Sequence, residues 1–340
     1  MHFPLNIKVH YPEGKGRIIL RAESDWTADV RPTRVEGVVT VFEIKARAPF
    51  LYFKPCLVTD ESFHWSCGTN YLAYIGEPES LNIYPRFYSE KAGGTITEVE
   101  DYTCFETGRL HKTRTYLPSG YHENPLRSYP VLYMHDGNNL FFPREAFLGQ
   151  DWQVDETMGM LDDLNIINKV IVVGVWPNDR EDEYTRPGYE VYGRFIVRDL
   201  KPVIDKRLRT IPGPATTAVM GSSLGGVVSF YMAWQWPEVF GLAACMSSTF
   251  GWKDDLMRRV ASEQRRPIRI YLDSGGPGDN YEVTRAMRDM LLLRGYKLGS
   301  ELLCFAFAQD RHNEKYWAMR SHIPFQFFFS KLPHGLQQQH

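Results

Sequence analysis

The sequence predicts an α/β fold with a doubly wound, mostly parallel sheet over residues 95–332, preceded by a small β-sandwich domain over residues 1–94. Three observations support this prediction. Residues 1–94 hold short runs rich in β-branched residues, separated by turn formers and without a helical period. From residue 130 onward, apolar strand-like runs alternate with helical patterns. One of those runs passes straight into a helical pattern through Gly-Ser-Ser-Leu-Gly at 221–225.

In the N-terminal part, strands are expected at 38–46, 50–57 and 81–87. Several short strands with regular turn signals favour a sandwich. Its Trp26, Trp65, Tyr71 and Tyr74 could stack on sugars, although aromatic side chains on a sandwich more often belong to the core or pack against a neighbouring domain. The Ala-Gly-Gly sequence at 92–94 is the best domain boundary, because the pattern changes after it.

In the second part, two antiparallel strands are expected first, and strands then alternate with helices. The expected strands are 96–105, 110–117, 130–134, 169–175, the run that ends at Gly221, 241–246, 269–272 and 301–308. The expected helices are 154–164, 192–209, the one that begins at about Leu224, 281–293 and 316–329. Residues 333–340 are expected to form a tail.

Composition places the 340-residue chain among globular proteins, with 43% hydrophobic and 24% charged residues. A formal net charge of −2 gives no reason to expect nucleic acid or an anionic membrane as a partner. No apolar run reaches the roughly 20 residues that cross a bilayer, and residues 1–10 lack a signal peptide's apolar segment. We therefore expect a cytoplasmic protein. Secretion is the alternative if a signal peptide has been removed.

The five cysteines suit a reducing compartment, and one disulfide, such as Cys56–Cys67, is kept as an alternative.

The Gly-Ser-Ser-Leu-Gly turn matches the G-x-S-x-G nucleophile elbow, with Ser223 at its centre. A serine on a sharp strand-to-helix turn needs strained backbone angles, and side chains two residues to either side would collide. Gly221 and Gly225 remove those side chains. The alternative is a glycine-rich turn that only lets the helix pack close to the sheet.

A serine nucleophile needs a base, usually histidine, and that base needs an acid partner. In this fold class the chain order is serine, acid, histidine. His312 follows the last expected strand, at the sheet edge where ligand sites concentrate, and is the predicted base. Asp273 and Asp279 both follow the strand that ends at Leu272. We prefer Asp279, because its glycine-rich loop has room to reach an imidazole, and Asp273 stays open.

Acyl transfer also needs hydrogen-bond donors for the oxyanion. The amide that follows the nucleophile, on Leu224, is one candidate, and the Asn138 amide after an early central strand is the other. Residues expected to line the substrate pocket are Trp176, Arg180, Tyr184 and Trp252, although any of these rings could belong to the core instead.

Three segments together, 116–121, 129–141 and 220–226, resemble the enterochelin esterase and esterase-D-like branch of the α/β-hydrolases, which includes feruloyl esterases and mycolyltransferases. The stretches 178–187 and 311–317 resemble that family's Arg-Tyr-Pro loop and its tryptophan after the histidine. The resemblance covers about residues 96–330. It implies a serine esterase with Ser223 as nucleophile, Asp279 as acid, His312 as base, Leu224 and Asn138 at the oxyanion, and neither metal nor cofactor.

The sequence therefore predicts a serine carboxylic-ester hydrolase that forms an acyl-enzyme on an aryl, sugar or siderophore-type ester. The expected partner is a small-molecule or carbohydrate-linked ester, and a homodimer stays open. Two alternatives also stay open. One is an acyltransferase to a sugar acceptor. The other is a carbohydrate-binding protein on an inactive hydrolase scaffold.

Overall fold

The computed structural model describes residues 3–74, 80–88 and 94–331. It divides into two compact units, which are described separately. The first unit comprises 1–94 with the segments 118–128 and 159–168, and the second comprises 95–117, 129–158 and 169–340. Residues 92 and 93 of the expected domain boundary and the expected tail at 333–340 lie outside the described residues.

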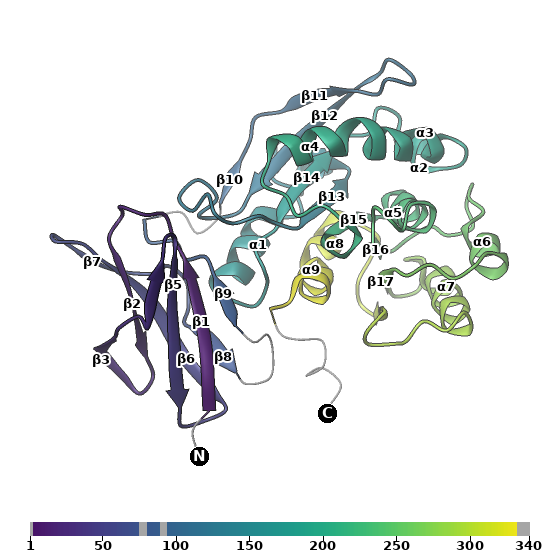
Figure 1. The fold of residues 1–340 in the computed structure, drawn as a ribbon. Coiled ribbons are helices and arrows are strands. Elements are labelled where there is room, and N and C mark those ends of the chain that lie inside the picture. The colour runs from purple at the N-terminus through teal and green to yellow at the C-terminus, as the bar shows by residue number, and fades with distance from the viewer. Residues whose placement is uncertain (1–2, 75–79, 89–93, 332–340) are drawn as a thin grey trace. The chain divides into compact units, whose positions relative to one another are not determined.

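The first unit is built from two sheets (Figure 1). A four-stranded sheet has the order β4-β5-β1-β9, and a five-stranded sheet has the order β3-β2-β6-β7, with β8 also paired to β6. The strands are β1 (Phe3–His10), β2 (Arg17–Ala22), β3 (Asp25–Val30), β4 (Arg34–Glu36), β5 (Val39–Ala46), β6 (Phe50–Val58), β7 (Phe63–Trp65), β8 (Tyr71–Tyr74) and β9 (Leu81–Ile83). All pairs except β1–β9 are antiparallel, and the sandwich packing itself stays a prediction.

Alternating burial gives the first unit its core. Every second residue of β1 is buried, namely Leu5, Ile7 and Val9, as expected for a strand with one face against a core. These side chains share one apolar cluster with residues of β2 and β6, such as Leu20 and Phe53.

The second unit contains a nine-stranded sheet in the order β10-β12-β14-β13-β15-β16-β17-β18, with β11 paired to β12. Pairing is parallel from β14 through β18 and antiparallel around β12, which confirms the expected mostly parallel α/β fold. The strands are β10 (Thr95–Ile96), β11 (Glu100–Thr103), β12 (Leu110–Leu117), β13 (Val131–His135), β14 (Ile171–Val175), β15 (Thr217–Ser222), β16 (Leu242–Met246), β17 (Arg269–Gly275) and β18 (Leu302–Phe307). The residues of β13 to β16 are all buried, as their nearly unbroken apolar runs predict.

Helices α1 to α7 connect the parallel strands, and α8 and α9 follow the last strand. They are α1 (Val154–Asp163), α2 (Arg180–Tyr184), α3 (Gly188–Arg194), α4 (Lys201–Arg207), α5 (Leu224–Gln235), α6 (Leu256–Ser262), α7 (Tyr281–Leu293), α8 (Glu314–Arg320) and α9 (His322–Phe329). Figure 1 shows α3 and α4 as one continuous helical stretch, joined through a π-helical segment at Phe195–Leu200.

Two helical expectations differ from the structure. The helix expected at 192–209 begins earlier, at Gly188, directly after Pro187. The single helix expected at 316–329 is two helices, α8 and α9, which meet at Ser321. Pro324 explains the break, because proline has no N–H to bond back to the preceding turn and is tolerated only in the first turn of a new helix.

Parallel register brings the carboxyl ends of neighbouring strands to one edge of the sheet. Ser222 of β15 is opposite Met246 of β16, and Met246 is opposite Asp273 of β17. Loops that leave these ends therefore start side by side, where ligand sites of open α/β sheets form.

Candidate active site

Ser223 occupies a sharp turn between β15 and α5. Its backbone angles, φ 56° and ψ −120°, are unusual for a residue with a side chain, and its amide N–H donates to the Met246 carbonyl at 2.8 Å. A Cβ added to Gly221 would lie 2.6 Å from the carbonyl carbon of Gly225, so the turn requires glycine there. The turn is thus a strained nucleophile elbow.

His312 lies in the loop between β18 and α8, close to the elbow. Its Nε2 is 2.9 Å from the Ser223 Oγ, and its Nδ1 is 2.5 Å from the Asp279 Oδ1. Trp317 packs edge-on against the ring, with 4.9 Å between centroids. Three residues that are far apart in the sequence therefore form one continuous row of polar contacts.

Asp279 is well supplied with hydrogen-bond donors. Its Oδ2 accepts from the Gly275 N–H at 2.5 Å and from the Ser247 Oγ at 2.8 Å. Burial alone would raise the pKa of Asp279, but hydrogen bonds from His312, Ser247 and Gly275 outweigh it and hold the pKa below its ordinary value. This carboxyl group is therefore ionised at neutral pH.

Asp273 lies inside β17 and is fully buried. It accepts a hydrogen bond from the Tyr271 hydroxyl at 2.8 Å and lies 3.3 Å from Arg320. Burial raises the pKa of Asp273 to about 6, although Arg320 acts in the opposite direction. The imidazole thus contacts Asp279, the acid preferred from the sequence.

The loop after β13 contains Asn138, one of the two residues expected at the oxyanion. Asp136 adopts a left-handed conformation, with φ 55°, and its amide N–H donates to the Tyr184 hydroxyl at 3.0 Å. Its carboxylate binds Arg180 through two hydrogen bonds of 2.9 Å each. Asn138 follows in a short 3-10 helix. Across from this loop, Leu224 begins α5, and the first amides of a helix have no acceptor within it.

Two buried side chains, His135 and Tyr192, lie beneath that loop and contact each other. The His135 Nδ1 is 3.0 Å from the Tyr192 hydroxyl, and burial, together with the charge of Arg180, lowers the pKa of His135 to about 3. The imidazole is therefore uncharged at neutral pH. Arg180 stays charged: burial opposes its charge, but the Asp136 carboxylate raises the pKa of the guanidinium above its ordinary value.

The four residues expected to line the pocket have different environments. Tyr184 is fully buried and supports Asp136, so it has no surface to offer a substrate, contrary to the expectation. Arg180 is paired with Asp136. Trp176 is half-buried against Gly137, and Trp252 is 44% exposed, with the Lys253 Nζ 4.8 Å from its ring centroid.

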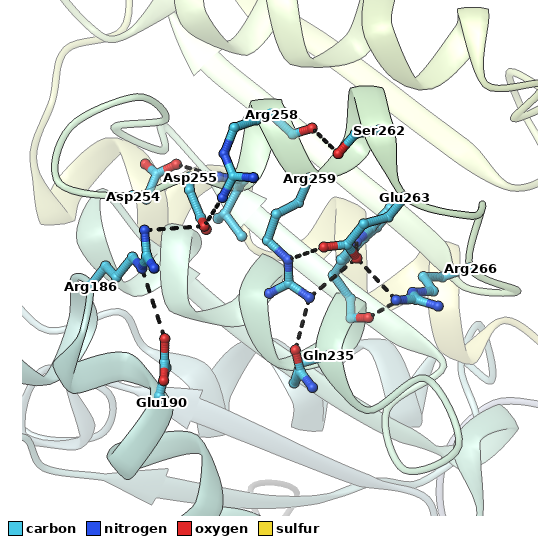
Figure 2. A network of polar contacts seen from close by, with 12 residues as sticks. Arg186, Glu190, Gln235, Asp254, Asp255, Arg258, Arg259, Ser262, Glu263 and Arg266 are labelled. Atoms are coloured by element: carbon cyan, nitrogen blue, oxygen red, sulfur yellow. Dashed lines mark hydrogen bonds and ion pairs between the residues drawn. The ribbon is translucent and has the colours of Figure 1, made fainter.

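A hollow of about 880 Å³ lies between residues 179–187 and the loop residues 253–254. The Arg186 N–H donates to the Lys253 carbonyl at 2.8 Å, and Lys253 forms an ion pair with Glu181. Figure 2 shows that Arg186 also forms ion pairs with Glu190 and with Asp255, the residue before α6. These pairs connect the start of α6 to residues 179–187. The walls of the hollow are therefore held together by charge pairs.

Two buried residues beside Asp279, Ser247 and Arg320, were not predicted from the sequence. Ser247 directly follows β16, so the rule that ligand sites gather at strand ends could have found it. Arg320 is the last residue of α8, and no local pattern marks it.

All five cysteines are free thiols. Among the residues that the structure describes, no helix has the length and apolar character needed to cross a membrane.

A strained serine elbow at the carboxyl edge of a mostly parallel sheet is the architecture of the α/β-hydrolases. The sequence profile of the "Putative esterase" family matches residues 106–330. The chain belongs to this family and is an esterase, a hydrolase of carboxylic esters. The family resemblance noted in the sequence is thereby confirmed.

The chain is also similar to individual proteins. The uncharacterized protein YjcH of Bacillus subtilis (strain 168) is 33% identical over 190 residues, which cover 54% of this chain and 73% of YjcH. A solved ferulic acid esterase matches with a TM-score of 0.59 at 16% identity, over 69% of this chain and 98% of that one. The enterobactin esterase FES of Shigella flexneri, solved in the presence of enterobactin, matches with a TM-score of 0.57 at 13% identity, over 96% of this chain and 92% of that one. At these identities, the two solved structures show a shared fold.

Proposed function

We propose that the protein is a serine carboxylic-ester hydrolase in which Ser223 is the nucleophile, His312 the general base and Asp279 the acid. The observation that carries the proposal is the contact at each ring nitrogen of His312, 2.9 Å to Ser223 and 2.5 Å to Asp279. In this arrangement Nδ1–H donates to the carboxylate, and Nε2 accepts the Ser223 proton as the hydroxyl attacks.

The reaction then follows from these groups. The Ser223 Oγ bonds to the acyl carbon, and the developing oxyanion is met by the amides of Leu224 and Asn138, each worth about 3 kcal/mol to the transition state. His312 returns its proton to the leaving alkoxide, which leaves an acyl-enzyme. His312 next takes a proton from water as the water oxygen bonds to the same carbon. The bond between that carbon and the Ser223 Oγ then breaks, His312 returns the proton to Oγ, and the carboxylic acid is released.

The substrate is proposed to be an aryl, sugar or siderophore-type ester. Trp252 directly precedes Lys253, which lines the large hollow, and its indole is 44% exposed. An exposed aromatic ring suits a bulky ring-bearing ester better than a short alkyl ester. Feruloyl, acetyl-sugar, catecholate and short-acyl esters form the panel that tests this. The highest kcat/KM is expected on a ring-bearing ester, and a preference for short alkyl esters would contradict the proposal.

The decisive experiment removes the nucleophile. Ser223→Ala should abolish hydrolysis of p-nitrophenyl acetate and prevent labelling by a fluorophosphonate, whose adduct in the wild type should map to Ser223. Ser248→Ala is a control, because it deletes another buried hydroxyl, which has no hydrogen-bond partner among the described residues. Turnover retained by Ser223→Ala would refute the assignment.

A further inference from the structure

Ser247 is buried directly behind Asp279. It follows β16, has no exposed surface, and adopts a positive φ of 43°. Its Oγ lies 2.8 Å from the Asp279 Oδ2, the carboxylate oxygen that faces away from His312. The ionised carboxylate can only accept, so the hydroxyl is the donor.

Two further groups point at the same hydroxyl. The Trp317 Nε1–H donates to the Ser247 Oγ at 3.0 Å, and the Arg320 Nη2 donates at 2.9 Å. A hydroxyl has two lone pairs and one hydrogen, and neither an indole nor a guanidinium N–H can accept. Both lone pairs are therefore occupied, and the only hydrogen must point at Asp279.

Arg320 is the buried cation of this cluster. Its guanidinium lies 3.3 Å from Asp273, 3.3 Å from Asp310 and 3.8 Å from Asp279, and its side chain is 3% exposed. A buried charge of this kind needs partners on several sides, which fixes the guanidinium in place. It thereby also fixes the N–H that Ser247 accepts.

We propose that Ser247 and Arg320 are positioning residues of the active site, which hold the Asp279 carboxylate in the orientation that presents Oδ1 to His312. The inference rests on the proposed roles of Ser223, His312 and Asp279. Arg320 orients the Ser247 hydroxyl, and that hydroxyl and the Gly275 amide occupy Oδ2. The carboxylate therefore cannot turn its other oxygen toward the imidazole.

The loss of the Ser247 hydroxyl has two consequences. Asp279 keeps only the Gly275 amide on Oδ2, so its orientation loosens. A donor that stabilised the negative carboxylate is also gone, so proton binding to the coupled Asp279–His312 pair becomes more favourable.

The test compares Ser247→Ala with Ser248→Ala, which deletes the neighbouring buried hydroxyl that has no partner among the described residues. Both are assayed with p-nitrophenyl acetate from pH 5 to 9. Ser247→Ala should lower kcat about 10- to 100-fold, the usual effect of a hydrogen bond to a charged group, with little change in KM. Its acid limb of kcat/KM should move to higher pH, whereas Ser248→Ala should match the wild type. A merely structural role would lower activity without moving the limb, and that result would overturn the inference.

If Ser247→Ala does not fold by circular dichroism, Trp317→Phe replaces it. Phenylalanine keeps a ring against His312 but removes one donor to Ser247, so a smaller shift in the same direction is expected, and an unmoved profile overturns the inference. Inactivity of Ser223→Ala with wild-type behaviour of Ser247→Ala would refute only the positioning role. Turnover retained by Ser223→Ala would instead refute the proposed function.

Discussion

The guanidinium of Arg180 holds the carboxylate of Asp136 in a fork, with Nε to Oδ1 and Nη2 to Oδ2 both 2.9 Å. Nη2 also donates to the Ser222 carbonyl at 3.3 Å. Asp136 lies two residues before Asn138, and Ser222 lies two residues before Leu224. One side chain therefore ties together the two segments whose amides are proposed to bind the oxyanion.

Arg180→Lys is expected to lower kcat about tenfold or more with little change in KM. Lysine keeps the charge but cannot form the fork, so the amide donors would be less well fixed where charge develops. Steady-state kinetics on p-nitrophenyl acetate measure both constants. A raised KM with unchanged kcat would instead mean that Arg180 binds the substrate directly, as the sequence predicts.

Arg186→Lys is a suitable control for that experiment. Arg186 has about half of its side chain exposed and forms ion pairs with Glu190 and Asp255, as Figure 2 shows. Exposed pairs of this kind contribute about 1 kcal/mol or less, so kcat should stay within about twofold of the wild type.

Asp279→Asn should lower kcat by about 10³- to 10⁴-fold while the fold is retained. The asparagine oxygen would accept from the Gly275 amide and the Ser247 hydroxyl, so its NH2 group would face the imidazole. That donor holds the imidazole in the wrong tautomer, and the negative charge that stabilises an imidazolium is lost. Asp273→Asn should lose far less, because Asp273 contacts Tyr271 and Arg320 rather than the imidazole. Equal losses in the two variants would contradict the assignment of the acid.

Strand pattern alone could locate much of this site. Ser223 stands in a motif whose glycine spacing is dictated by the turn itself, and His312 follows the last strand of the sheet. The choice between Asp279 and Asp273 could not be made firmly, because both follow the same apolar run. The structure extends β17 to Gly275, so Asp273 lies within the strand and only Asp279 has the reach of a loop.

Other features depended on packing between distant segments. Tyr184 is an aromatic residue in a predicted site loop, and nothing in its neighbours indicates that it is fully buried beneath Asp136. Arg320 is separated from Ser247 by 73 residues, and the two side chains come into contact only in the folded protein. Local periodicity carries no information about such pairs.

Gly137→Ala should disable the oxyanion loop. A Cβ at this position would lie 2.6 Å from the Trp176 ring and 2.7 Å from the backbone of Gly174 and Val175, which cannot move aside within the sheet. We expect kcat to fall at least tenfold and the free energy of unfolding to fall by about 1–3 kcal/mol. Gly108→Ala is the control, because its Cβ would meet open space at φ 72°, so only about 1 kcal/mol of backbone strain is expected. Full activity of Gly137→Ala would show that the loop does not serve the reaction.

Asp273 should make stability depend on pH. Its pKa is raised by burial from 3.8 to about 6 in the folded protein, so the folded state binds the proton more tightly than the unfolded chain does. This stabilisation is present when the group is protonated and is lost as the pH rises from about 4 to about 6, by about 3 kcal/mol at 1.36 kcal/mol per pH unit. Urea unfolding of the wild type and of Asp273→Asn, compared between pH 4 and 8, isolates the effect because the other carboxyls cancel in the difference. The stability of the wild type relative to the variant should decline up to about pH 6 and then level off, whereas a constant difference would mean that burial does not perturb this carboxyl group.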